Sequence, residues 1–146
     1  MYKKEITYED LDGNQVTDTF LFYLPKNEIT DLNFKYDGDL AKYMNAIVEK
    51  KDTEKMYEFI KDLVLMAYGT KSEDSKRFIK VVDGHRLADD FYSSPAFSEL
   101  IEEFFATPEK IEEFINGCLP KAVLKEIEEA KKQNGGVLPA TNTPIQ

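Results

Sequence analysis

The stretch AYGTKSEDSKRFIK, residues 67–80, comes nearest to a pattern that could bind phosphate. A Gly-Thr-Lys tripeptide begins at Gly69, but a Walker-type loop needs several glycines, a Gly-Lys-Ser/Thr order and a preceding strand. Here a single glycine follows a run with helical periodicity. We therefore predict a structural corner, in which Gly69 is a helix C-cap and Phe78 and Ile79 re-enter the core after a polar loop.

His85 and Cys118 are the only histidine and the only cysteine of the chain. Zinc sites combine several such ligands, so this pair does not predict one. Cys118 shares an apolar stripe with Phe114 and Ile115, where a thiol behaves as a small unreactive hydrophobe. The sequence leaves a Cys–His dyad open, but it shows no third group that would orient the pair. The role of His85 in the 81–86 loop stays undecided.

The acidic residues also have structural explanations that require neither metal binding nor catalysis. Asp10, Asp12 and Asn14 have calcium-binding side chains, yet their glycine stands at the fourth position of the loop, where an EF-hand needs it at the sixth. A hairpin turn explains the same residues. The glutamate pairs at 102–103 and 112–113 lie opposite apolar stripes, as a solvated helix surface requires. We predict no catalytic, cofactor-binding or metal-binding residue, and we expect a non-enzyme without cofactors.

The elements around these residues follow from hydrophobic periodicity. Residues 1–25 alternate between apolar and polar, turn near Gly13, and stop at Pro25, which has no N–H for a ladder. Over residues 37–133 apolar residues recur at i, i+3 and i+4, which predicts helices. The predicted fold class is α+β: a mainly α-helical domain with an N-terminal β-hairpin.

Two serine- or threonine-proline pairs predict where two of the helices begin. Ser94-Pro95 and Thr107-Pro108 each have an N-cap residue followed by proline at the first helical position. From residue 134 onward the chain is rich in glycine, proline and threonine. We expect a single globular domain over residues 1–133 and a flexible C-terminal tail over residues 134–146.

A few apolar residues are candidates for contact with another protein. Leu21 and Tyr23 share the second face of the returning strand, while the first face can pack on the helices. Phe105 is the second of two consecutive phenylalanines, which cannot both face the centre of one helix stripe. We predict a partner-binding surface of Leu21, Tyr23 and Phe105, joined by Val137 and Leu138 of the tail. A core that wraps widely around the helix explains Phe105 equally well.

The formal net charge of −9 restricts the partners. Nucleic-acid affinity comes largely from lysines and arginines that release phosphate counterions, so we predict no nucleic acid. No apolar run approaches the ~20 residues of a membrane span, and the N-terminus lacks the apolar region of a signal peptide. A single cysteine allows no internal disulfide. These features favour a cytoplasmic protein.

The order of features resembles a known family. The hairpin ITYEDLDGNQVTDTFLFYLPKNEIT precedes the distinctive LVLMAYGTKSEDSKRFIK, and FYSSPAF follows. Over roughly residues 5–120 this resembles the small tail assembly chaperones of long-tailed phages and prophages of Gram-positive bacteria. The segment KVVDGHRL departs from the family pattern.

The resemblance implies a non-enzymatic assembly factor in the host bacterial cytoplasm. Such chaperones bind the long, apolar tape measure protein, keep it soluble, and help tail tube protein polymerise around it. They are absent from the mature virion. Whether this chain forms a homo-oligomer is left open. The alternative is a structural tail or head–tail adaptor protein retained in the virion, which would form a closed ring with large interfaces.

Overall fold

The N-terminal hairpin consists of β1 (Tyr2–Glu9) and β2 (Gln15–Phe22), which pair antiparallel from Tyr2↔Phe22 to Glu9↔Gln15. The structure, a computed structural model, describes residues 1–36, 40–122 and 125. The turn is set by local chemistry, because the Asp10 carboxylate accepts hydrogen bonds from the backbone N–H groups of Asp12 and Asn14. Gly13 has a φ of +86°, which favours glycine over any residue with a Cβ.

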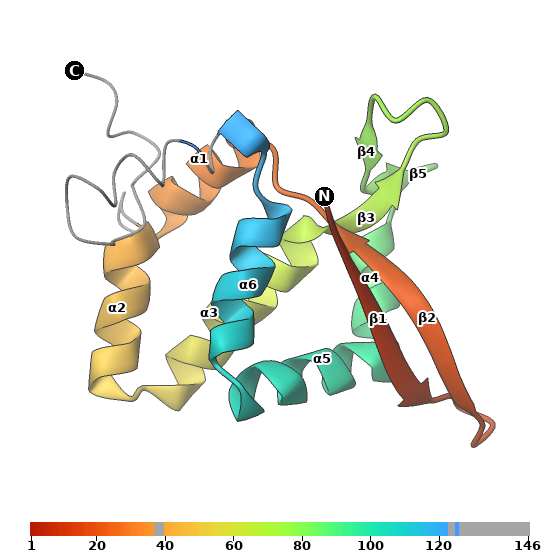
Figure 1. Cartoon of the computed structure of the whole chain (residues 1–146), viewed down its shortest axis with the longest axis horizontal. Helices are drawn as coiled ribbons and strands as arrows, with labels where there is room; N and C mark the ends of the chain where they lie inside the picture. The colour runs from red at the N-terminus through yellow and green to blue at the C-terminus, as the bar shows by residue number, and fades with distance from the viewer. Residues whose placement is uncertain (37–39, 123–124, 126–146) are drawn as a thin grey trace. The chain divides into compact units, whose positions relative to one another are not determined.

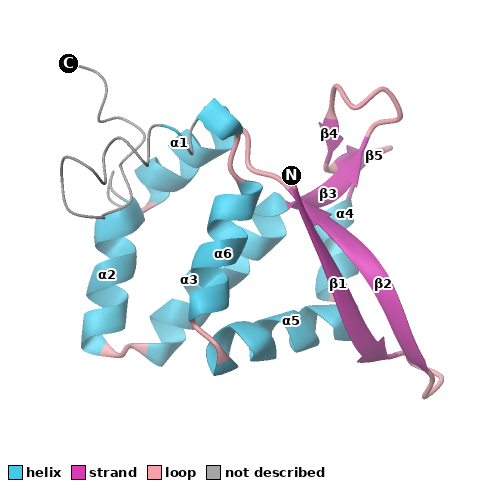
Figure 2. Cartoon of the chain, viewed as in Figure 1, coloured by secondary structure: helices cyan, strands magenta, loops and turns pink. Residues whose placement is uncertain are grey.

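A four-stranded antiparallel sheet grows from this hairpin in the order β1-β2-β3-β4. β3 (Tyr68–Lys71) pairs with the end of β2, where Leu21 lies opposite Gly69, and β4 (Phe78–Ile79) pairs with β3. A separate two-stranded ladder joins β5 (Val81–Val82) to β6 (His85–Arg86). Figure 2 shows these strands in magenta.

The helices form two groups along the chain, one between β2 and β3 and one after β6. α1 (Lys26–Lys35), α2 (Leu40–Lys50) and α3 (Thr53–Ala67) come after the hairpin, and α4 (Leu87–Tyr92), α5 (Pro95–Ala106) and α6 (Glu109–Cys118) come after β6. The start of α5 is as predicted, because the Ser94 hydroxyl accepts a hydrogen bond of 3.1 Å from the N–H of Ala96. Proline at the first helical turn loses nothing, since its N–H would have no partner there.

The chain divides into two compact units, and one of the boundaries between them falls within α3. The first unit comprises Met1–Tyr23 and Lys61–Cys118, and the second comprises Leu24–Ile60 and Leu119–Gln146. In the first unit Phe22 is fully buried, and its ring centroid lies between 5.1 and 6.5 Å from those of four neighbours. These neighbours are Tyr2, Tyr68, Phe91 and Phe114. The alternate side chains of β1 and β2, which face away from this cluster, are mostly exposed and polar.

The second unit has a core of its own. The ring of Tyr36, at the end of α1, lies 4.6 Å from that of Tyr43 on α2 and 5.2 Å from that of Phe59 on α3. Tyr36 and Phe59 are buried, and so are Ile29 and Leu32 on α1. This pattern follows the apolar spacing that predicted α2 and α3 in the sequence.

The α+β class and the N-terminal hairpin are confirmed. The part over residues 37–133 for which we expected helices also contains the short strands β3 to β6, between residues 68 and 86. Gly69 is also not a helix C-cap, because it lies in β3 and its φ is not positive. The single domain over residues 1–133 remains a prediction. The predicted flexible tail, residues 134–146, lies outside the described residues.

Candidate functional site

The open end of the hairpin carries a pocket in the first unit. Here the end of β2 meets the end of α3: the N–H of Tyr23 donates to the carbonyl of Ala67 at 2.8 Å. The Lys80 ammonium donates to the carbonyl oxygens of Tyr23 at 2.9 Å and Met66 at 2.5 Å. Carbonyls in the last turn of a helix lack partners within it, so a lysine donor is favourable there. This contact fixes the backbone that carries Tyr23.

Gly69 permits β4 to approach β3 closely beside this contact. A Cβ at this position would lie 2.5 Å from the carbonyl oxygen of Ile79 and 2.7 Å from the ring of Phe78. Glycine is therefore required by the packing of β4 on β3, and the corner predicted from the sequence is a pair of short strands. Phe78 in turn packs against Tyr23, with ring centroids 5.7 Å apart.

The loop between β3 and β4, Ser72–Arg77, is held by its own hydrogen bonds. The Ser72 hydroxyl donates to the Asp74 carboxylate at 2.6 Å, and the same hydroxyl oxygen accepts from the N–H of Arg77 at 3.0 Å. The N–H of Lys76 also donates to Asp74, at 3.0 Å. The hydrogen bond from Ser72, with that from the Lys76 backbone, holds the pKa of the Asp74 carboxyl below its usual range. The loop is thus ordered without any apolar core of its own.

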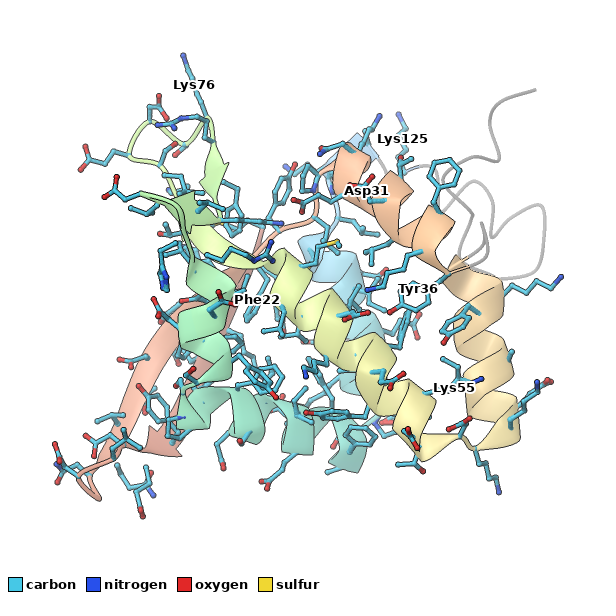
Figure 3. The ribbon with its side chains drawn as sticks, turned by 180° about the vertical axis from the view of Figure 1, so that it is seen from behind. Phe22, Asp31, Tyr36, Lys55, Lys76 and Lys125 are labelled. Atoms are coloured by element: carbon cyan, nitrogen blue, oxygen red, sulfur yellow. The ribbon has the colours of Figure 1, made fainter. Side chains whose placement is uncertain are left out.

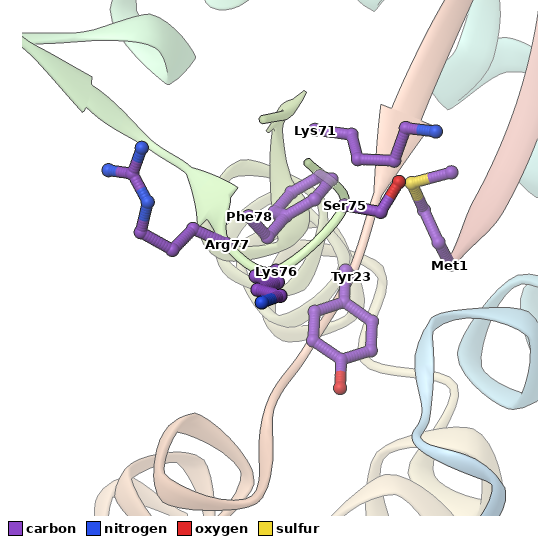
Figure 4. A pocket seen from close by; sticks show the side chains of 7 residues that line it. All are labelled: Met1, Tyr23, Lys71, Ser75, Lys76, Arg77 and Phe78. Carbon is purple, nitrogen blue, oxygen red and sulfur yellow. The ribbon is translucent and has the colours of Figure 1, made fainter. Parts of the chain in front are cut away.

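These elements surround the β3–β4 pocket, which encloses about 230 Å³ (Figure 4). Its aromatic lining is Tyr23 and Phe78, its cationic lining is Lys71, Lys76 and Arg77, and Met1 and Ser75 complete it. Lys76 projects from the tip of the loop into solvent (Figure 3). Small-molecule sites usually enclose roughly 300–1,000 Å³, so a pocket of this size fits one side chain better than a cofactor.

The structure brings some predicted partner-binding residues together and leaves others apart. Leu21 near the end of β2 and Tyr23 directly after β2 are both half-buried, and Tyr23 lines the pocket. Phe105 is half-buried on α5, a helix that packs on β1, α4 and α6. Phe104 is buried, so the two phenylalanines divide between core and helix edge, as expected. Val137 and Leu138 lie outside the described residues.

Exposed apolar side chains that the sequence did not single out lie elsewhere in the first unit. Val81 and Val82 are 52% and 45% exposed on β5, and Tyr92 is 46% exposed on α4. The signal for β5 was available in Val-Val-Asp-Gly, because Asp83 and Gly84 both have positive φ, as in a type I′ hairpin turn. On its own, a two-residue strand gives no period-two pattern.

The candidates for catalysis do not assemble into a site. The His85 ring lies 2.9 Å from the Asp90 carboxylate, and both side chains are more than half exposed. Burial raises the pKa of the Cys118 thiol far above its usual range, which keeps it uncharged and unreactive. Among the described residues no group of histidine, cysteine, aspartate and glutamate side chains could hold a metal ion. No helix of the described ranges has the length and apolarity to cross a membrane.

Comparison with protein families gives a match that covers nearly the whole chain. The family model described as "Phage tail assembly chaperone" matches residues 1–145. Comparison with curated proteins gave no match, and comparison with solved structures gave none either.

Proposed function

The chain belongs to the phage tail assembly chaperone family, and from that membership we propose that it binds the tape measure protein and assists tail tube polymerisation. The family match over residues 1–145 is the observation that carries the proposal. Membership implies a non-enzymatic role with protein partners in the phage tail. The specific clients, tape measure protein and tail tube protein, come from the resemblance of the sequence.

We place the client-binding surface at the end of β2. Leu21 and Tyr23 offer partly exposed apolar area on a backbone that Lys80 holds in place. A client that is long and apolar needs such area, and a fixed surface loses less conformational entropy on binding than a mobile one. Phe105 on α5, together with Val137 and Leu138, extends the proposed surface. The net charge of −9 would keep a complex with an apolar client in solution by mutual repulsion.

A pull-down with two sets of variants tests this surface. The variant Leu21→Asp with Tyr23→Asp, and separately Phe105→Asp, should each lower the recovery of tape measure protein by about tenfold or more. Thr19→Asp is the matched control, because Thr19 is exposed on the same face of β2. All variants must first show a cooperative thermal transition near that of the wild type. Recovery equal to that of Thr19→Asp would remove these residues from the client surface.

We also propose that the protein acts in the host bacterial cytoplasm and leaves before the particle is complete. Mass spectrometry of purified virions distinguishes this from an adaptor that stays in the tail. The proposal expects no peptides of this chain in the virion beyond trace contamination. A fixed stoichiometric ratio to the tail tube protein would assign the chain to the structural class instead.

A further inference from the structure

The β3–β4 pocket is cationic although the chain as a whole is acidic. Three of its seven lining residues are Lys71, Lys76 and Arg77, and none of the seven is acidic. The whole chain has 28 acidic and 19 basic residues, so its average composition would give the opposite sign. All three cations are exposed, and none forms an ion pair among the described residues. The pocket therefore offers positive charge that no anion of the described chain neutralises.

The acids of the β3–β4 loop do not fill the pocket. The Asp74 carboxylate is engaged within the loop, where it accepts from the Ser72 hydroxyl and from the N–H of Lys76. Glu73 is exposed, and neither acid lines the pocket. The N–H of Arg77 donates to the Ser72 hydroxyl oxygen, so the backbone that carries both loop cations is fixed. Their charges are thus presented by an ordered loop, which loses little conformational entropy on binding.

The floor of the pocket is aromatic. The half-buried rings of Tyr23 and Phe78 have centroids 5.7 Å apart. The Lys80 ammonium lies 5.7 Å from the centroid of the Phe78 ring and adds a further positive charge beside the floor. In the view of Figure 4 the side chains of Lys71 and Arg77 extend to either side of the Phe78 ring. An occupant therefore meets apolar surface at the centre and positive charge at the edges.

This arrangement distinguishes between classes of occupant. A simple anion would pair with the cations but leave the aromatic floor exposed. A nucleic-acid strand would bring a row of phosphates against a chain of net charge −9. A volume of about 230 Å³ is small for a cofactor. A protein segment with an apolar side chain between two carboxylates uses both the floor and the edges, so it has the complementary charge pattern.

We propose that the β3–β4 pocket recognises an acidic linear segment of another protein, in which one apolar side chain lies between two carboxylates. The apolar side chain packs on Tyr23 and Phe78, and the carboxylates pair with Lys71 and Lys76. Because these cations are exposed, each ion pair contributes little, and the binding is weak and falls as salt rises. The proposal goes beyond the client-binding surface and does not depend on the identity of the client.

An NMR titration of the isotope-labelled full chain with short capped peptides tests the pocket. The probe is Gly-Asp-Phe-Asp-Gly. The control Gly-Asn-Phe-Asn-Gly removes the charge at constant shape, and Gly-Asp-Gly-Asp-Gly removes the apolar side chain. The probe should shift the backbone resonances of Tyr23, Lys71 and residues 75–78 until they saturate. Each control peptide should bind more weakly by about tenfold or more.

Removal of two cations from the protein gives the matched test. Lys71→Gln with Lys76→Gln should weaken binding of the probe by about tenfold or more. Lys50→Gln with Lys55→Gln, which removes two exposed cations of the second unit, should leave it unchanged. Neither pair alters Tyr23, which the client-binding surface shares. The titration contains no client protein, so its result is separate from the success or failure of the proposed client.

Four results overturn the proposal. They are the absence of saturable shifts at the pocket, equal binding of the uncharged peptide, equal binding of the peptide without phenylalanine, and wild-type binding in Lys71→Gln with Lys76→Gln. Shifts of the same resonances when the protein is concentrated without peptide would also overturn it, because they would assign the pocket to a second copy of this chain.

Discussion

Gly69 controls the junction between α3 and the sheet through the space that it leaves empty. The carbonyl of Ile79 belongs to a paired strand, so it cannot move away from an added methyl group as a flexible side chain would. A position with an ordinary φ rarely requires glycine. At position 69 the requirement comes from packing alone, because other atoms lie where a Cβ would be.

The substitution Gly69→Ala should lower the free energy of unfolding by about 1–3 kcal/mol, because it overpacks β3 against Phe78 and Ile79. Chemical denaturation of the two proteins measures this difference. Thr70→Ala, on the exposed neighbouring position, should change stability by only about 0.5 kcal/mol. If Gly69→Ala were as stable as the wild type, β3 and β4 would be able to move apart and fit the added methyl group at no cost in the free energy of unfolding.

Glu103 should make the stability of the fold depend on pH. Burial alone would raise its pKa, but the hydrogen bond and charge of Lys4, with the charge of Lys110, outweigh burial and hold the pKa below its usual value. A lowered folded-state pKa adds stability above the unfolded-state pKa, and this stability is lost as the pH falls through the folded-state pKa.

We therefore expect Glu103→Gln to be less stable than the wild type at neutral pH by no more than about 1 kcal/mol, since the pair is partly exposed. The difference should shrink as the pH falls through the lowered pKa of Glu103 in the folded state. Urea denaturation at a series of pH values measures it. A difference that stays constant with pH would mean that the ion pair with Lys4 contributes nothing.

At the scale of elements, Lys80 joins a strand to a helix. Its ammonium is shared by the carbonyls of Tyr23 and Met66, which belong to segments more than forty residues apart in the chain. Lys80→Met keeps the apolar stem and removes the donor, so it should cost about 1–3 kcal/mol of stability. Hydrogen exchange at the N–H of Tyr23 should accelerate in this variant. The exposed Lys71→Met serves as the control, and unchanged exchange in Lys80→Met would mean that other contacts hold the end of β2.

The longer elements could be predicted from sequence because their signals are local. The spacing of apolar residues predicted α2, α3, α5 and α6, and alternation around Gly13 predicted the hairpin. The short strands could not be predicted in this way, because β3 exists through its pairing with Leu21 and Phe22, far away in the chain. For the same reason the sequence singled out Leu21 and Tyr23 as candidates but not the cations that line the β3–β4 pocket together with Tyr23.

At the scale of the whole molecule, membership of the chaperone family places the interest in surfaces that can bind other proteins. The family match assigns a chaperone role, and the first unit offers an apolar strand end and a cationic pocket. None of these features requires a cofactor, and each can be altered by exposed substitutions that leave the core of Phe22 intact. This makes the proposed role open to a direct test in solution.

The most direct test is co-expression of this chain with the tape measure protein of the same phage, followed by solubility measurement and size exclusion. The account predicts that tape measure protein, insoluble alone, becomes soluble and elutes together with this chain. Leu21→Asp with Tyr23→Asp should return it to the insoluble fraction, while Thr19→Asp should not. Tape measure protein that stays insoluble while the wild-type chain elutes alone would contradict the chaperone role proposed for this surface.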